Sequence, residues 1–144
     1  MYMHKYNVDR NDIREITQNR GVSMGGPGEW QIDVSYASRA SFRKFNRNHP
    51  LEYSSCFANL DKVLVLLNTG HSIGSFQLGF LRPEGGGVSR IGQTGVPAAK
   101  ESRLYVYFTQ RGRTVYILGI GTKETQQTDI AAAKKLIKRI KSSG

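Results

Sequence analysis

The side chains of this 144-residue chain that are best suited to chemistry are cationic, and they gather in its last third. Arg103 stands in a segment of alternating apolar residues, and Lys123 follows the next such segment. A guanidinium offers a fork of N–H donors that fits two oxygens of one phosphate, and an ammonium neutralises charge as a point cation. With a formal net charge of +10, the chain is predicted to bind a polyanion: ribosomal RNA, mRNA, DNA or an acidic protein.

The expected last helix adds a second cationic feature. From about Thr128 onward apolar residues recur at helical spacing, which predicts an amphipathic helix. Its outward side would carry Lys134, Lys135, Lys138 and Arg139. We interpret this stripe as a surface for RNA, and the alternative is an ordinary solvated helix face.

The spacing of the histidines and of the cysteine gives less support to a metal site or to catalysis by these residues. The three histidines are widely separated and Cys56 is the only cysteine, so no metal-ligand pattern is present and no metal is expected. His71, near a predicted helix end, has the side chain of a general base, although a surface histidine is the simpler interpretation. Cys56 falls in an apolar run, which indicates a buried thiol in a reducing compartment.

Hydrophobic periodicity predicts the elements that would position these residues. Residues 30–36 alternate between apolar and polar side chains, as in a half-buried strand. Two helices should follow, over residues 38–46 and over residues 53–67, with Pro50 between them. Together they would form a helical hairpin.

The later segments are predicted to be mostly strands. We expect a strand over residues 73–80, a loop over residues 82–87 and a further strand over residues 88–93. A hairpin should follow over residues 103–119, with its turn near Gly112. The last helix would then close the domain.

This order of elements indicates an α+β fold: a small twisted, mostly antiparallel sheet packed against an N-terminal helical hairpin and a C-terminal basic helix. A Gly-Gly-Pro-Gly run breaks regular structure, so residues 1–28 are expected to be an arm with a Gly-rich linker and residues 29–144 the domain. No window is apolar for long enough to cross a membrane, and residues 1–20 lack the apolar core of a signal peptide. We therefore expect a cytoplasmic protein.

The C-terminal third resembles the RelE/ParE toxin superfamily, and in particular its phage-derived HigB-like branch. The resemblance covers about residues 31–141 and is carried by SRLYVYF at 102–108, TVYILGI at 114–120 and KETQQT at 123–128. In the family the matching pieces are an Arg-led strand, an apolar strand and a Lys-Lys-Thr-Gln-Lys-Thr segment before the last helix. The resemblance implies a RelE-like fold and the toxin of a type II toxin-antitoxin pair. Such toxins are commonly ribosome-dependent endoribonucleases that cut mRNA by attack of a ribose 2′-OH on the adjacent phosphate.

The same resemblance implies roles for individual residues. Arg103 matches a phosphate-contacting arginine, Lys123 matches a cation just beyond the last strand, and Arg90 resembles a basic residue of the preceding strand, so these three are the expected catalytic residues. Tyr105 and Tyr107 would share a sheet face with Arg103 and either stack on a base or pack in the core. The resemblance implies no metal or organic cofactor, and as partners a cognate antitoxin in a hetero-oligomer, the ribosome and mRNA.

The pattern of this chain leaves the general base open. Ribonuclease members of the superfamily often carry Tyr or His in the last turn region, where this chain has Thr128 and Asp129. Lys123, His71 or the ribosome would have to supply that function. Two alternatives to the nuclease also stay open: a ParE-like inhibitor of DNA gyrase, and a non-catalytic basic module that binds nucleic acid.

Overall fold

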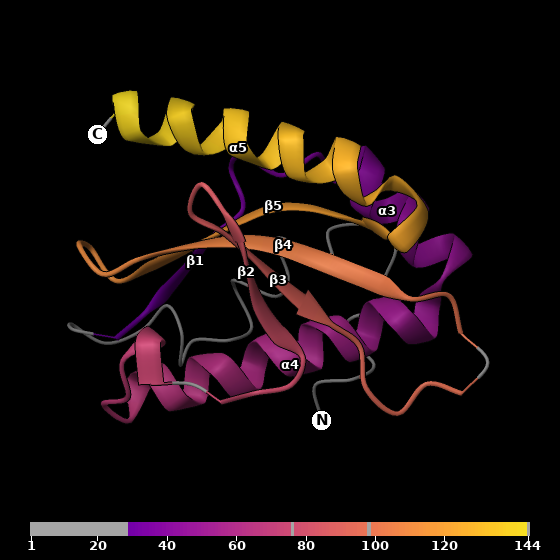
Figure 1. Cartoon of the computed structure of the whole chain (residues 1–144), viewed down its shortest axis with the longest axis horizontal. Helices are drawn as coiled ribbons and strands as arrows, with labels where there is room; N and C mark the ends of the chain where they lie inside the picture. The colour runs from indigo at the N-terminus through magenta and orange to yellow at the C-terminus, as the bar shows by residue number, and fades with distance from the viewer. Residues whose placement is uncertain (1–28, 76, 98, 144) are drawn as a thin grey trace.

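The structure, a computed structural model, describes residues 29–75, 77–97 and 99–143; the predicted arm over residues 1–28 lies outside them. The described residues form an α+β fold with a five-stranded mixed sheet of order β1-β5-β4-β3-β2. In Figure 1, α5 lies on one side of the sheet and α4 on the other. The elements are β1 (Gln31–Asp33), α3 (Arg39–Asn48), α4 (Pro50–Asn68), β2 (Leu81–Gly85), β3 (Val88–Gly92), β4 (Ser102–Thr109), β5 (Thr114–Thr122) and α5 (Gln126–Ser143). Two short 3₁₀ turns are η2 (Ile73–Ser75) and η3 (Lys123–Thr125).

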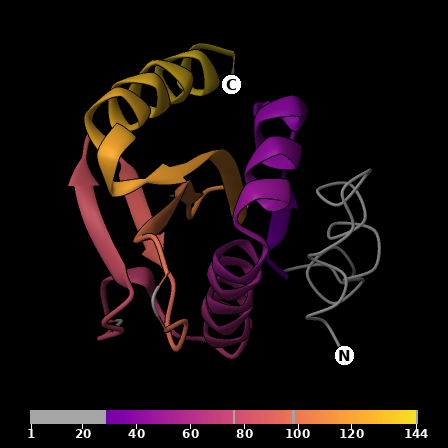
Figure 2. The ribbon, with the colours of Figure 1, turned by 90° about the vertical axis from the view of Figure 1, so that its right-hand side faces the viewer.

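Both faces of the sheet are buried, each by its own apolar cluster, and Figure 2 shows the helices on the two sides. On the side of α3 and α4, the cluster includes Phe57 and Leu104. On the side of α5, it includes Tyr105, Leu118 and Ile137. Successive residues of a strand point to opposite faces, so β4 supplies both clusters. The predicted packing of a sheet between a helical hairpin and a C-terminal helix is confirmed.

The helices begin and end close to where the sequence predicts them. α3 starts after Ser38, whose Oγ accepts a hydrogen bond from the backbone N–H of Ser41 at 3.2 Å, as an N-cap does. Pro50 occupies the first turn of α4, where its missing N–H costs no helical hydrogen bond. The predicted burial of Cys56 on α4 is also confirmed, and burial raises the pKa of this thiol to about 12.

Two predictions for the middle of the chain are wrong. Within the predicted strand over residues 73–80, the described residues form the 3₁₀ turn η2 and a turn at residues 79–80, and no strand. The predicted loop over residues 82–87 instead contains most of β2, which pairs antiparallel with β3. Pro83 is tolerated because β2 is an edge strand of the sheet, where one row of N–H groups needs no partner strand. Gly86 and Gly87, both with positive φ, then form the turn into β3.

The first strand is shorter than predicted and, unlike the other paired strands, runs parallel to its neighbour. β1 covers only three residues, and it pairs with β5 in parallel. It ends where the Asp33 side chain accepts a hydrogen bond from the backbone N–H of Ser35 at 2.8 Å, a local turn that competes with the strand. The sheet is therefore mixed, with antiparallel pairing among β2, β3, β4 and β5.

The start of α5 lies very close to the backbone of β5 at Gly121. A Cβ built on Gly121 would overlap the carboxylate of Asp129 and lie 2.7 Å from Thr125 Oγ1. Thr125 Oγ1 in turn donates a hydrogen bond to Asp129 Oδ2 at 2.7 Å. Only glycine leaves room for this contact, which fixes where α5 leaves the sheet.

We expect Gly121→Ala to lower the free energy of unfolding by about 1–3 kcal/mol, the usual cost of forcing an extra methyl into a filled space. Gly119→Ala, on the same strand, is the matched control, because a Cβ there meets no atom within 4 Å. Urea denaturation followed by circular dichroism measures both variants. Equal stability of the two variants would contradict the close packing at Gly121.

Candidate functional site

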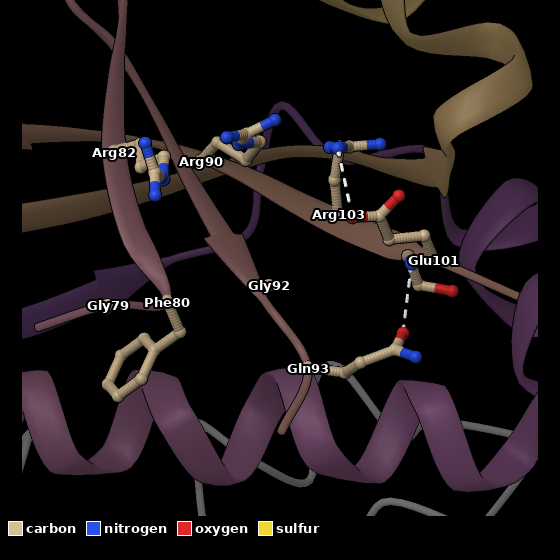
Figure 3. Close-up of a pocket in the computed structure, with 9 residues that line it drawn as sticks. Gly79, Phe80, Arg82, Arg90, Gly92, Gln93, Glu101 and Arg103 are labelled. Atoms are coloured by element: carbon tan, nitrogen blue, oxygen red, sulfur yellow. Dashed lines mark hydrogen bonds and ion pairs between the residues drawn. The ribbon is translucent and has the colours of Figure 1, made fainter. Parts of the chain in front are cut away.

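Three arginines from three neighbouring strands line one cavity. Arg82 on β2, Arg90 on β3 and Arg103 on β4 border a space of about 200 Å³, which we call the arginine cavity. Figure 3 shows their guanidinium groups on one side of the sheet, while Phe80 points to the other side. Strand pairing sets this arrangement, since Arg82 lies opposite Arg90, and Arg90 opposite Tyr105 on the face that carries Arg103.

Two carboxylates hold the cations of this site in place. Glu84 Oε2 pairs with Arg90 Nε at 3.0 Å. Glu101 pairs with two cations at once: its Oε2 lies 3.6 Å from Arg103 Nη2, and its Oε1 lies 3.8 Å from Lys123 Nζ. Side chains of like charge would otherwise repel one another at this spacing. The site is thus an alternation of cations and carboxylates with a net positive charge.

The segment that carries Glu101 is fixed by hydrogen bonds from three directions. The backbone N–H of Lys123 donates to the carbonyl of Glu101 at 2.8 Å. On either side of Glu101, the N–H of Lys100 donates to Glu52 Oε2 on α4 at 3.2 Å, and the N–H of Ser102 donates to Gln93 Oε1 at 2.9 Å. The Glu101 side chain itself stays 61% exposed. A fixed backbone with an open carboxylate is the arrangement that a catalytic group needs.

Arg103 is buried, yet part of its hydrogen-bonding capacity is unused. The residue is 7% exposed, and Nη1 has no hydrogen-bond partner among the described residues. The hydroxyl of Tyr105, two residues along the same strand face, is also buried without a partner in the described part of the chain. Unpaired buried donors are rare because each costs free energy. The unpaired Nη1 beside the arginine cavity indicates a place for an anionic ligand.

Burial dominates the electrostatics around Tyr105 and Asp129. Loss of solvent raises the pKa of the Tyr105 hydroxyl to about 12, helped by the carboxylate of Asp129 and opposed mainly by Arg103. Burial also raises the pKa of Asp129, while the hydrogen bond from Thr125 lowers it. Both groups lie between the sheet and the start of α5, beside the cations of the site.

The structure brings together the three predicted catalytic residues. Arg90 and Arg103 line the same cavity, and Lys123 joins them through Glu101. His71 is absent from this group: it lies beyond the end of α4, beside a different cavity near the β4–β5 turn. Its Nδ1 is 3.2 Å from the carbonyl of Leu66, the position of a capping side chain. His71 therefore lies apart from the three predicted catalytic residues.

The predicted RNA-binding residues differ in their exposure to solvent. Lys134, Lys135, Lys138 and Arg139 are all exposed on α5, as predicted. Tyr105 is fully buried beneath α5, so its ring has no free face for a base and packs in the core, the other role that the sequence allows. Tyr107 keeps part of its surface exposed.

Three residues of the site are missed by the sequence analysis: Arg82, Glu84 and Glu101. Arg82 and Glu84 stand in the segment predicted as a loop, and only the pairing of β2 with β3 places them beside Arg90. Glu101 supplies a carboxylate within reach of two cations, which is the type of group that can take a proton from a hydroxyl. Its position one residue before a strand led by Arg103 was the available signal.

Several features are absent from the described part of the chain. No helix there is long and apolar enough to cross a membrane, and no group of three or more His, Cys, Asp or Glu side chains is arranged to hold a metal ion. Comparisons of the chain with protein-family models, with curated proteins and with solved structures find no match.

We expect Tyr105→Phe to raise the free energy of unfolding at neutral pH by about 1 kcal/mol. The substitution keeps the buried ring and removes a hydroxyl that has no partner among the described residues, so the cost of burying it disappears. Urea titration of the two proteins measures the difference. A loss of stability would show that the hydroxyl is bonded in the folded protein.

The raised pKa of Tyr105 also predicts how stability depends on alkaline pH. The folded pKa of about 12 exceeds the ordinary value of 10, so the folded state holds this proton more tightly. The resulting stability is complete below pH 10 and is lost as the pH rises towards 12. Unfolding measured across this range should show a smaller loss in Tyr105→Phe than in the parent. Identical pH profiles would contradict the shift.

Proposed function

We propose that this chain is the toxin of a type II toxin-antitoxin pair with a RelE-like fold, and that it cuts mRNA on the ribosome at the arginine cavity. The observation that carries the proposal is the convergence of Arg82, Arg90 and Arg103 beside the pair formed by Glu101 and Lys123. Guanidinium groups fixed before the substrate arrives suit a phosphate whose charge grows in the transition state.

The reaction needs a base, a charge stabiliser and an acid, and the site offers a candidate for each. Glu101 takes the proton of a ribose 2′-OH as that oxygen attacks the adjacent phosphorus. Arg103 and Arg90 bind the non-bridging oxygens of the phosphate. Lys123 gives a proton to the 5′ oxygen as its bond to phosphorus breaks. The products are a 2′,3′-cyclic phosphate and a 5′-OH end, with no metal ion in any step.

The ion pairs of the free protein support this assignment. Glu101 lies between Arg103 and Lys123, close to the place where a phosphate would meet both cations. A bound phosphate offers the same cations new oxygen partners, which leaves the carboxylate beside the ribose hydroxyl.

The proposal includes partners. A chain with a formal net charge of +10 favours ribosomal RNA and mRNA as partners, through release of counterions from phosphates. An antitoxin would silence the site most simply by placing carboxylates, or a helix, over the arginine cavity.

We expect Glu101→Gln to slow mRNA cleavage by about 10²–10⁴-fold, the usual contribution of a general base. The substitution keeps the size of the exposed side chain and a carbonyl oxygen that can face Arg103 and Lys123, and circular dichroism checks that the fold is retained. Arg103→Lys, which keeps the charge and loses the fork of donors, should slow cleavage by about 10²–10³-fold. The measurement is inducible expression in a bacterial host, with mapping of mRNA 5′ ends within minutes.

Lys62→Ala, an exposed lysine on α4, is the control and should cut as the parent does. New 5′-OH ends at fixed codon positions in translated messages, lost in both site variants, are the expected result. Growth arrest with intact mRNA would contradict the proposed nuclease activity and favour inhibition of DNA gyrase. Absence of arrest would favour a binding module.

A further inference from the structure

A second cavity lies at the other end of β4 and shares no residue with the arginine cavity. It has a volume of about 560 Å³ and is bordered by the tip of the β4–β5 hairpin and the last turns of α5. Its walls include Tyr107, Gln110, Arg111, Tyr116, Ile140 and Lys141. We call it the aromatic groove.

The rings of this groove are held in place by one another. Tyr107 and Tyr116 are stacked, with ring centroids 5.9 Å apart and planes 22° apart. Tyr36 meets Tyr116 edge to face at 5.9 Å, and its hydroxyl lies 3.3 Å from Ser143 Oγ at the end of α5. Tyr107 and Tyr116 nevertheless remain partly exposed. The groove therefore presents aromatic surface that is already fixed, so a planar ligand need not order it.

A row of cations leads from the aromatic groove to the turn of the β2–β3 hairpin, whose strands carry Arg82 and Arg90. Lys134, Lys138 and Lys141 follow one another at helical spacing along one side of α5, over about 10 Å. The stem of Lys134 lies against Gly86, in the turn of the hairpin that carries Arg82 and Arg90. This lysine stripe ends at Lys141, in the wall of the groove. Arg139 points elsewhere, over the ring of Tyr36 at 5.6 Å.

We infer that the aromatic groove binds an unpaired base of the RNA whose phosphate occupies the arginine cavity, an inference that rests on the proposed function. Tyrosine rings beside cations suit single-stranded RNA, because every base has a face that can stack and every linkage carries a charge. Arg103 and Tyr107 are four residues apart on β4, about 13 Å, which is the length of about four stacked nucleotides. The lysine stripe follows the backbone between the two sites.

The side chains of the aromatic groove distinguish between two possible ligands, RNA and an acidic protein segment. Carboxylates would use Arg111 and Lys141 and gain little from the tyrosine rings, whereas a base needs the rings. Substitutions that remove a ring while keeping apolar bulk therefore test the identity of the ligand. Tyr107→Leu and Tyr116→Leu are such substitutions, and Tyr107→Phe, which keeps the ring, is their matched control.

The experiment measures binding of a short fluorescein-labelled oligouridine with 2′-O-methyl groups, which cannot be cleaved, to the full chain by fluorescence anisotropy. Each Leu variant should raise the Kd by about 5- to 150-fold, the effect of losing one stacked base. Tyr107→Phe and Lys62→Ala should stay close to the parent. If one Leu variant fails to fold, the other Leu variant still tests whether a tyrosine ring contributes to binding. Photo-crosslinking of the parent to a 4-thiouridine oligonucleotide, with label expected on the peptides of Tyr107 or Tyr116, needs no variant.

Unchanged Kd in the Leu variants, or an equal rise in Tyr107→Phe, would overturn the inference, as would crosslinks confined to other peptides. Failure of this inference differs from failure of the proposed function. If cleavage depends on Glu101 while the Kd for RNA is the same without the tyrosine rings, the aromatic groove is not an RNA site and the proposed nuclease activity is still supported. If the Kd for RNA depends on the tyrosine rings and no mRNA is cut, the aromatic groove is an RNA-binding site and the proposed nuclease activity is contradicted.

Discussion

The contact between Gly121 and the start of α5 is the constraint on which the cationic surface depends. Because Asp129 and Thr125 lie directly against the β5 backbone, α5 can leave the sheet in one direction only. That direction places η3, with Lys123, beside Glu101, and it lays the helix across Tyr105. It also brings the last turns of α5 to the tip of the β4–β5 hairpin, where the aromatic groove forms. The position of Lys123 beside Glu101 and the aromatic groove both depend on how this helix begins, whereas strand pairing sets the arginine cavity.

Charge balance is the second constraint. Three arginines and a lysine can share a small region only if carboxylates separate them, and Glu84 and Glu101 fill that role. The two pairs differ in a way that bears on function. Glu84 and Arg90 are both largely buried, so their pair is a permanent part of the sheet, whereas the Glu101 side chain is exposed. Under the proposed function, a phosphate entering the arginine cavity displaces the exposed pair and leaves the buried one, so that Glu84 has a structural role and Glu101 a chemical one.

Much of the fold can be predicted from local sequence patterns. Most of the features that were missed depend on contacts between residues far apart in the sequence. The period of the apolar residues predicts α3, α4, α5 and the β4–β5 hairpin, since each buries a continuous face. The β2 strand is missed because its proline and glycines suit a loop, and only its edge position makes them acceptable. Arg90, Arg103 and Lys123 are predicted from a resemblance, but Glu101 becomes visible only when strand pairing brings Lys123 to it. The aromatic groove joins the end of α5 to a hairpin turn about 30 residues earlier in the chain, a contact that no short pattern encodes.

The proposed function and the proposed groove together give the lysine stripe of α5 a role, as a path for one strand of RNA. Arginine contacts with phosphate position a strand but distinguish no sequence, and stacking on tyrosine is similarly tolerant of the base. A single arginine cavity would hold any phosphate in any orientation, including those of a folded RNA. A second site at a fixed distance along the same strand admits only a chain whose bases are unpaired between the two, because a duplex hides its base faces. Under the proposed function, selection for single-stranded RNA arises from the length of β4, without hydrogen bonds to base edges, and codon preference comes from the ribosome that presents the message.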